Sequence, residues 1–275
     1  AFKPQEYWSV IAHMEHDGTP FIARLIRHKG NKIDRLTIGD AGSAADAKAA
    51  VEAGRFTVQS VETKPLTRNP PPPFTTSTLQ QEAARKLGFS ASHTMRLAQG
   101  LYEAGDITYM RTDGVQMDGS AISAARGAIA NRYDASYVPD KPRHYTAKAK
   151  NAQEAHEAIR PTEFSKERAG SGDDAKLYDL IFKRALASQM ASARMERTTA
   201  EMADGTGQTG LRATGQVVLF PGYLAIYEEG RDDEGDEESR RLPRLNEGDA
   251  PAKKSVESEQ HFTQPPPRYS EASLV

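Results

Sequence analysis

Four consecutive prolines, Pro70–Pro73, place the strongest constraint on how this chain can fold. Proline has a fixed φ angle and no backbone N–H, so a run of four can continue neither a helix nor the interior of a sheet. Such a run forms a stiff, extended polyproline segment. We therefore expect a domain boundary at Asn69, immediately before the prolines.

The sequence before the prolines has the alternation of apolar and polar residues that is typical of β-strands. The alternation is clearest from Arg55 to Thr63 and is also present over 7–10 and 21–27. Between these stretches, the Ala-rich sequence from Ser43 to Gly54 begins with a capping residue and ends at a glycine. This pattern predicts one short helix.

The sequence after the prolines predicts helices. Ser77–Gln80 matches a capping box and indicates a helix that ends at Gly88. A second helix is expected to start near Ser90 or Ser92 and to end at Gly105. Two short helices joined by a tight glycine turn favour a helix-turn-helix, or winged-helix-like, arrangement.

Two further helices are expected over 118–132 and 173–190. From about residue 193 the strand pattern returns, over 198–202, 210–220, 223–227 and 253–262. The acidic run 228–238 is expected to be a solvated loop.

These patterns together predict an α+β fold. A discontinuous β-rich domain, residues 1–68 and 193–275, would carry an inserted, mainly helical domain, residues 69–192. Because the chain leaves and re-enters the β-rich domain near 68 and 193, we expect the two crossings to lie side by side as a two-stranded hinge.

Composition excludes some kinds of protein. The chain has no cysteine, which rules out disulfides and cysteine-based zinc ribbons within it and permits a reducing cytoplasm. No apolar run approaches the ~20 residues that a membrane-spanning helix needs, so we expect no membrane partner. The net charge of −2 does not by itself suggest nucleic-acid binding, but local charge matters more than the total.

One candidate for chemistry lies directly after the second predicted helix. Tyr109 could attack phosphorus as a nucleophile, and Arg111 offers a guanidinium suited to phosphate oxygens. The competing interpretation is a packed tyrosine ring with a solvated hydroxyl, because the chain has 10 tyrosines. On the residues alone, the packed ring is favoured.

A second candidate cluster contains His156, Glu157 and Arg160, which lie at helical spacing. The histidine could relay a proton or bind phosphate, or it could simply be satisfied by a neighbouring glutamate, Glu154 or Glu157. The spacing of His13 and His16 resembles a metal-binding pair, but no third ligand is near, so we interpret it as coincidence.

Several long strings in the chain resemble the active-site blocks of the bacterial type IA DNA topoisomerases. The strings follow the same order over essentially the whole chain: Thr75–Ala83 through Leu101–Asp113, Asn151–Thr162, and then the shorter His261–Thr263, Pro265–Pro266 and Arg268–Val275. Met110, between the tyrosine and the arginine, resembles topoisomerase I more than topoisomerase III, where a proline is usual.

The resemblance implies a role for each candidate residue. Tyr109 would form a 5′-phosphotyrosyl bond with the cut strand, and Arg111 would position the scissile phosphate and stabilise developing charge. His156 would contact the phosphate or assist proton transfer. Three residues would have supporting roles, the first two by orienting these cations: Asp113, Glu157 and Arg160.

One residue departs from the family pattern. Gly114 stands where the family more often has a serine, and this puts the local loop geometry in doubt.

The resemblance also implies partners and a cofactor. The chain would form the arch of a toroidal, monomeric enzyme in the cytoplasm, at the nucleoid. This enzyme would act on single-stranded or negatively supercoiled DNA and relax negative supercoils without ATP. Mg²⁺ would bind to a toprim domain, which no part of this sequence matches, so we expect no cofactor or metal site in these residues. The toprim and base domains would be the chain's partners, and the chain alone is expected to be inactive, with Tyr109 exposed.

Two alternatives remain open on the sequence. The first is a non-catalytic helix-turn-helix module that binds DNA and uses Tyr109 only for stacking or packing. The second is a structural spacer whose hinge is its function and whose affinity for DNA is negligible. A covalent adduct with DNA would distinguish the enzyme from both.

Overall fold

The structure is a computed structural model and describes residues 2–146, 156–230 and 241–266. Its contacts divide the chain into two units. The first, which we call the β unit, comprises Ala1–Leu66, Met195–Val218 and Gly235–Pro267. The second, the helical unit, comprises Thr67–Arg194, Leu219–Glu234 and Arg268–Val275.

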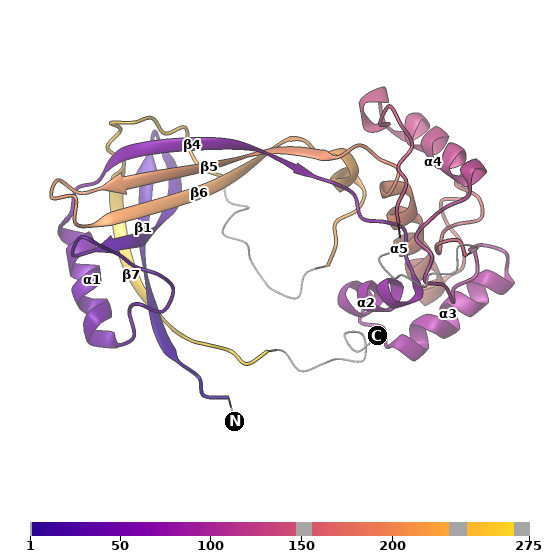
Figure 1. Cartoon of the computed structure of the whole chain (residues 1–275), viewed down its shortest axis with the longest axis horizontal. Helices are drawn as coiled ribbons and strands as arrows, with labels where there is room; N and C mark the ends of the chain where they lie inside the picture. The colour runs from indigo at the N-terminus through magenta and orange to yellow at the C-terminus, as the bar shows by residue number, and fades with distance from the viewer. Residues whose placement is uncertain (1, 147–155, 231–240, 267–275) are drawn as a thin grey trace. The chain divides into compact units, whose positions relative to one another are not determined.

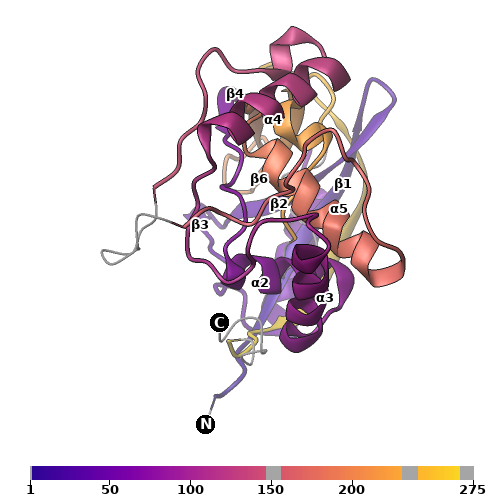
Figure 2. The ribbon, with the colours of Figure 1, turned by 90° about the vertical axis from the view of Figure 1, so that its right-hand side faces the viewer.

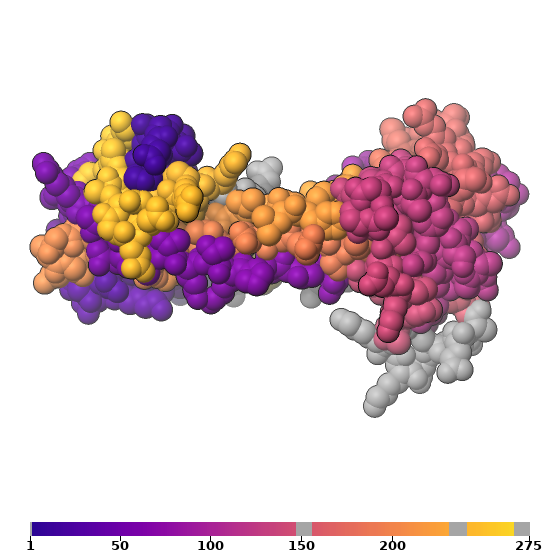
Figure 3. Space-filling view, turned by 90° about the horizontal axis from the view of Figure 1, so that it is seen from above, coloured from indigo at the N-terminus to yellow at the C-terminus, as the bar shows by residue number. Residues whose placement is uncertain are grey.

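The described strands form one sheet (Figure 1). Its strands are β1 (Glu6–His16), β2 (Thr19–His28), β3 (Asn31–Lys32), β4 (Thr57–Arg68), β5 (Ala193–Ala203), β6 (Gly210–Phe220) and β7 (Ala252–Phe262). The order is β4-β5-β6-β2-β1-β7, with β3 paired to β2. β1 pairs antiparallel with both β2 and β7, and in Figure 3 the yellow atoms of β7 lie against the indigo atoms of the N-terminal strand.

The core of the β unit lies between this sheet and helix α1 (Ala41–Ala53). The alternation of β1 points Val10, Ala12 and Met14 into the core, where all three are buried. The N-cap of the helix is Asp40, whose carboxylate accepts a hydrogen bond of 2.8 Å from the backbone N–H of Ser43. The helix therefore begins before the serine that the sequence suggested as its cap.

The helical unit is built around α5 (Gly172–Ala187), which packs against α2 (Thr76–Leu87), α3 (Ala91–Glu103) and α4 (Gly119–Arg132) (Figure 2). Two short 3₁₀ helices, η1 (Ala135–Tyr137) and η2 (Gly222–Ala225), complete its described elements. The interior side of α5 is apolar apart from Arg184, so its burial against three helices accounts for its central place. An α+β fold is thus confirmed.

The glycine signals located the ends of helices better than the capping signals located their starts. Gly88 ends α2 with a left-handed φ of 69°, as expected. The helix starts earlier than predicted, because Thr75 is its N-cap and forms the capping box with Thr78. The expected strand over 223–227 is wrong, since this stretch is η2 followed by irregular chain.

The boundary between the two units falls within three neighbouring strands, β4, β5 and β6. The sequence predicted that β4 and β5 lie side by side. Ser192 Oγ donates a hydrogen bond of 2.6 Å to Asn69 Oδ1, which joins the residue before β5 to the residue after β4. The sequence did not predict that the chain also crosses the boundary at β6. It does so because residues 219–230 belong to the helical unit. The domain limits drawn from the sequence stay a prediction.

Tyr145 ties the proline segment to the end of α5. Its hydroxyl lies 2.7 Å from the carbonyl oxygen of Ser188 and 3.2 Å from that of Pro70. Burial disfavours the charged phenolate and raises the pKa of Tyr145 to about 12.

This raised pKa predicts a loss of stability at alkaline pH. The tyrosine pKa in the unfolded chain is about 10. The contribution of Tyr145 is therefore fully present below pH ~10 and is lost as the pH rises through ~12. We expect Tyr145→Phe to unfold more easily than wild type by about 1 kcal/mol at pH ~8, with the difference shrinking above pH ~10. Urea denaturation across this range measures it, and a difference independent of pH would contradict it.

Candidate active site

The loop that carries Tyr109, residues 108–116, is anchored at both ends on the segment 156–161. At its start, the N–H of Thr108 donates to the carbonyl of Arg160 at 2.9 Å. At its end, the N–H of Ala158 donates to the carbonyl of Gln116 at 2.8 Å. The two stretches are distant in sequence, so these bonds bring together the two clusters that the sequence singled out. We call them the Tyr109 loop and the His156 segment.

Thr76, the first residue of α2, fastens the middle of the Tyr109 loop. Its Oγ1 donates to the carbonyl of Met110 at 2.7 Å and accepts from the N–H of Thr112 at 2.8 Å. Its own N–H donates to the carbonyl of Thr112 at 2.9 Å. The loop is therefore fixed at both ends and at its centre, and the start of α2 sets its position.

Burial along the loop alternates so that the candidate side chains face outwards. The side chain of Met110 is buried, while its neighbours Tyr109 and Arg111 are exposed. Tyr109 is 46% exposed, as expected, and packs edge-on against Tyr102 with 5.3 Å between ring centroids. Its ring is supported on one side, while its surface remains open to a ligand.

Arg111 and Asp113 are exposed, and neither makes a hydrogen bond or ion pair with another residue that the structure describes. The sequence suggested that Asp113 orients a cation, and that role stays a prediction. An exposed guanidinium without a carboxylate partner among the described residues is suited to bind an anion such as a phosphate.

Glu157 and Arg160 form an ion pair that braces the His156 segment. Arg160 Nη2 lies 2.7 Å from Glu157 Oε2, and the other carboxylate oxygen accepts 2.8 Å from the N–H of Asp118, the N-cap of α4. The spacing of these residues suggested a helix, but residues 156–161 are extended. They form isolated β-bridges with Phe74, Ile107 and Gln116. The remainder of that string, 151–155, lies outside the described residues.

Gly114 brings the Tyr109 loop into contact with His156. A Cβ added to Gly114 would lie 1.9 Å from the carbonyl oxygen of His156, closer than any real contact. Only glycine fits the backbone as it stands. The side chain of His156 is exposed, at the start of its segment.

Thr76 and Thr108 are site residues to which the sequence assigned no role. Thr108 Oγ1 donates to the carbonyl of Ala158 at 2.8 Å and accepts from the N–H of Arg160 at 2.9 Å. Hydroxyl groups that satisfy distant backbone groups leave no local spacing pattern. Only the position of Thr76 immediately before a predicted helix could have drawn notice.

The described residues contain no group of three or more His, Cys, Asp or Glu side chains that could hold a metal ion. His13 instead lies 3.1 Å from Glu257, and His16 lies 3.2 Å from Asp249. None of the described helices is both long and apolar enough to cross a membrane.

Comparison with known proteins identifies the family. A family model described as DNA topoisomerase matches residues 1–275. DNA topoisomerase 1 of Zymomonas mobilis is 68% identical over 279 residues, covering 100% of this chain and 23% of that protein. DNA topoisomerase 1 of Xylella fastidiosa is 45% identical over 295 residues, again covering 100% of this chain and 36% of that protein.

A solved structure agrees with these matches. Full-length topoisomerase I from Thermotoga maritima, in a monoclinic crystal form, superimposes with a TM-score of 0.78 and 31% identity, covering 99% of this chain and 43% of that one. The chain thus spans less than half the length of the relatives it matches. Because the family match extends over all of its residues, this chain belongs to the DNA topoisomerase family.

Proposed function

We propose that this chain is the tyrosine-bearing part of a type IA DNA topoisomerase, in which Tyr109 cuts and rejoins one DNA strand. The observation that carries the proposal is an exposed Tyr109 on a loop fixed at three points, with the exposed Arg111 two residues away. A nucleophile must be reachable and well positioned, and this loop provides both.

The proposed reaction exchanges one phosphodiester for another. The phenolic oxygen of Tyr109 attacks phosphorus, an O–P bond forms to the tyrosine, and the bond from phosphorus to the 3′ oxygen of the preceding sugar breaks. The phenolic proton is removed and the leaving 3′ oxygen gains one. Because the number of phosphoester bonds is unchanged, the reverse reaction reseals the strand without ATP.

Two side chains would assist this exchange. The guanidinium of Arg111 would bind the non-bridging phosphate oxygens and stabilise the charge that develops on them. The imidazole of His156 would contact the phosphate or carry a proton. Asp113, Glu157 and Arg160 would support these groups, and the brace from Glu157 to Arg160 is suited to fixing the segment that presents the imidazole.

The wider expectations concern the whole protein. Mg²⁺ is the proposed cofactor of the whole protein, held by a toprim domain that no part of this sequence matches, and we derive no step through it. Single-stranded or negatively supercoiled DNA is the proposed substrate, the toprim and base domains are the proposed partners, and the nucleoid is the proposed location.

A labelled single-stranded oligonucleotide tests the proposal in a full-length topoisomerase that contains this segment. After denaturation, DNA labelled at its 3′ end should stay attached to protein, whereas DNA labelled at its 5′ end should be released as a shorter strand. Peptide mapping should locate the adduct on Tyr109. The 275-residue chain alone should not relax plasmid DNA. Salt-sensitive binding with no adduct would instead favour the non-catalytic binding module.

A further inference from the structure

The chain that follows β6, residues 221–230, belongs to the helical unit and packs against its helices α2 and α5. We call these residues the strap. It begins where Gly222, with a left-handed φ of 53°, approaches the chain just after α5. A Cβ on this glycine would lie 2.4 Å from the carbonyl oxygen of Ala191, so only glycine allows the approach. The N–H of Tyr223 donates to the same carbonyl at 2.9 Å.

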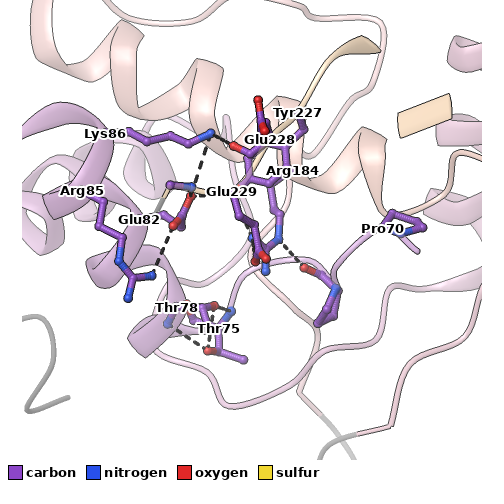
Figure 4. Close-up of polar contacts among 12 residues, drawn as sticks. Pro70, Thr75, Thr78, Glu82, Arg85, Lys86, Arg184, Tyr227, Glu228 and Glu229 are labelled. Carbon is purple, nitrogen blue, oxygen red and sulfur yellow. Dashed lines mark hydrogen bonds and ion pairs between the residues drawn. The ribbon is translucent and has the colours of Figure 1, made fainter. Parts of the chain in front are cut away.

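The strap inserts one hydroxyl between two buried charges. The hydroxyl of Tyr227 donates to Glu82 Oε2 on α2 at 2.8 Å and accepts from Arg184 Nη1 on α5 at 2.9 Å (Figure 4). Glu82 and Arg184 are each only 3% exposed. Burial raises the pKa of Tyr227 well above its usual range, so the hydroxyl keeps the proton that it donates.

The end of the strap satisfies the same two charges again. Glu229 Oε1 lies 2.9 Å from Arg184 Nη1, and the N–H of Gly230 donates to Glu82 Oε2 at 3.0 Å. Lys86 donates to the carbonyl of Glu228. This start of the acidic run is thus part of a packed cluster, while residues 231–238 lie outside the described part of the chain. A buried charge that loses a partner is costly, so the strap stabilises the positions of α2 and α5.

Arg184 connects this cluster to the candidate active site. Its Nε donates to the carbonyl of Pro72 at 2.6 Å, and its guanidinium lies 4.7 Å from the centre of the Phe74 ring. The carbonyl of Phe74 accepts from the N–H of Ile159, in the His156 segment, at 2.8 Å. Thr76, two residues further along, fastens the Tyr109 loop.

We propose that Tyr227 and Arg184 are positioning residues for the cleavage reaction, acting through the chain from Pro72 to Thr76. The strap holds Arg184 in place, and Arg184 is hydrogen-bonded to Pro72 at the start of this stretch. The same stretch is hydrogen-bonded to the Tyr109 loop through Thr76 and to the His156 segment through Phe74. Since the strap is the direct continuation of β6, it also joins a strand at the unit boundary to the site. The inference rests on the proposed function of Tyr109.

Tyr227→Phe tests the inference because it removes one hydroxyl and keeps the ring. The matched control is Tyr223→Phe in the same strap, since the Tyr223 hydroxyl makes no hydrogen bond to a described residue. In a full-length topoisomerase containing this segment, we expect Tyr227→Phe to slow single-turnover adduct formation by about tenfold or more. The affinity of Tyr227→Phe for the oligonucleotide should stay within about twofold of wild type, because Tyr227 is not in the Tyr109 loop. Tyr223→Phe should cleave like wild type.

A second measurement separates positioning from general stability. Cleavage is compared well below the unfolding temperature of each variant, where the folded fraction is the same. Amide hydrogen exchange at Ile159 and Thr112, whose N–H groups hold the site together, should be faster in Tyr227→Phe than in the control. If Tyr227→Phe does not fold, Glu229→Gln weakens the ion pair to Arg184 and should slow cleavage in the same direction.

The outcomes distinguish the two proposals. If Tyr227→Phe forms the adduct at the wild-type rate and its amide hydrogen exchange is also unchanged, the positioning inference is overturned. The proposed function of Tyr109 is then unaffected. Absence of any adduct in the wild-type enzyme would overturn the proposed function and the inference with it. Slowing of equal size in Tyr223→Phe would show a general effect of the strap on stability, and this too would overturn the inference.

Discussion

A full-length topoisomerase carrying Tyr109→Phe should form no covalent adduct with DNA, and its relaxation of supercoiled plasmid should fall by more than about a thousandfold. The substitution removes only the attacking oxygen. The ring can keep its edge-on contact with Tyr102, so the loop and the fold should be unaffected. DNA affinity should therefore stay close to that of wild type, and gel electrophoresis of plasmid topoisomers measures the activity.

The matched control for this prediction is Tyr102→Phe. Tyr102 is 41% exposed and lies beside Tyr109, so its hydroxyl is the nearest chemical equivalent that the proposal does not use. We expect this variant to retain adduct formation and relaxation. An adduct that persists in Tyr109→Phe, or that maps to Tyr102, would contradict the assignment of the nucleophile.

Gly114→Ala should be the most damaging single-methyl substitution in the site. The new methyl would lie 1.9 Å from the carbonyl oxygen of His156, and a backbone atom cannot turn aside as the end of a side chain can. We expect a loss of roughly 2–3 kcal/mol in the free energy of unfolding. Adduct formation should slow as well, because the loop and the His156 segment must separate to make room.

The control for Gly114→Ala is Gly127→Ala in α4, where an added Cβ has no neighbour within 4 Å. Alanine is the better helix former, so this variant should gain about 0.5–1 kcal/mol. Urea denaturation and the oligonucleotide cleavage assay compare the two. Equal stabilities and cleavage rates for Gly114→Ala and wild type would contradict the close contact between Gly114 and the His156 carbonyl.

Features that depend on local physics were predictable from the sequence. The end of α2 at Gly88 follows from the ability of glycine to adopt a left-handed φ, and β6 follows from its alternating pattern. The stretch 223–227 is an uninterrupted run of apolar and aromatic residues that was expected to be a strand, but it is not one. A short apolar run of this kind can equally be buried in irregular chain, and here Tyr223 and Tyr227 are both buried in the helical unit.

The candidate site was less predictable than the fold. The residues alone made Tyr109 a candidate but favoured a packed ring, and only the resemblance favoured a nucleophile, since that role depends on exposure and on neighbours that spacing does not reveal. The bonds from Thr76 to the Tyr109 loop join residues more than 30 positions apart, and the bonds of Thr108 span about 50. Contacts at such separations are set by the tertiary fold and leave no periodic signal in the sequence.

The three fastenings of the Tyr109 loop have a consequence for how DNA would be engaged. A chain already restrained in this way has lost most of its conformational freedom during folding, so binding a strand need not order it again. The entropy that a mobile loop would give up in every catalytic cycle is given up once, when the protein folds. Differences in cutting efficiency between DNA sequences should then originate in the nucleotides, which must themselves be distorted to reach a nearly rigid phenol.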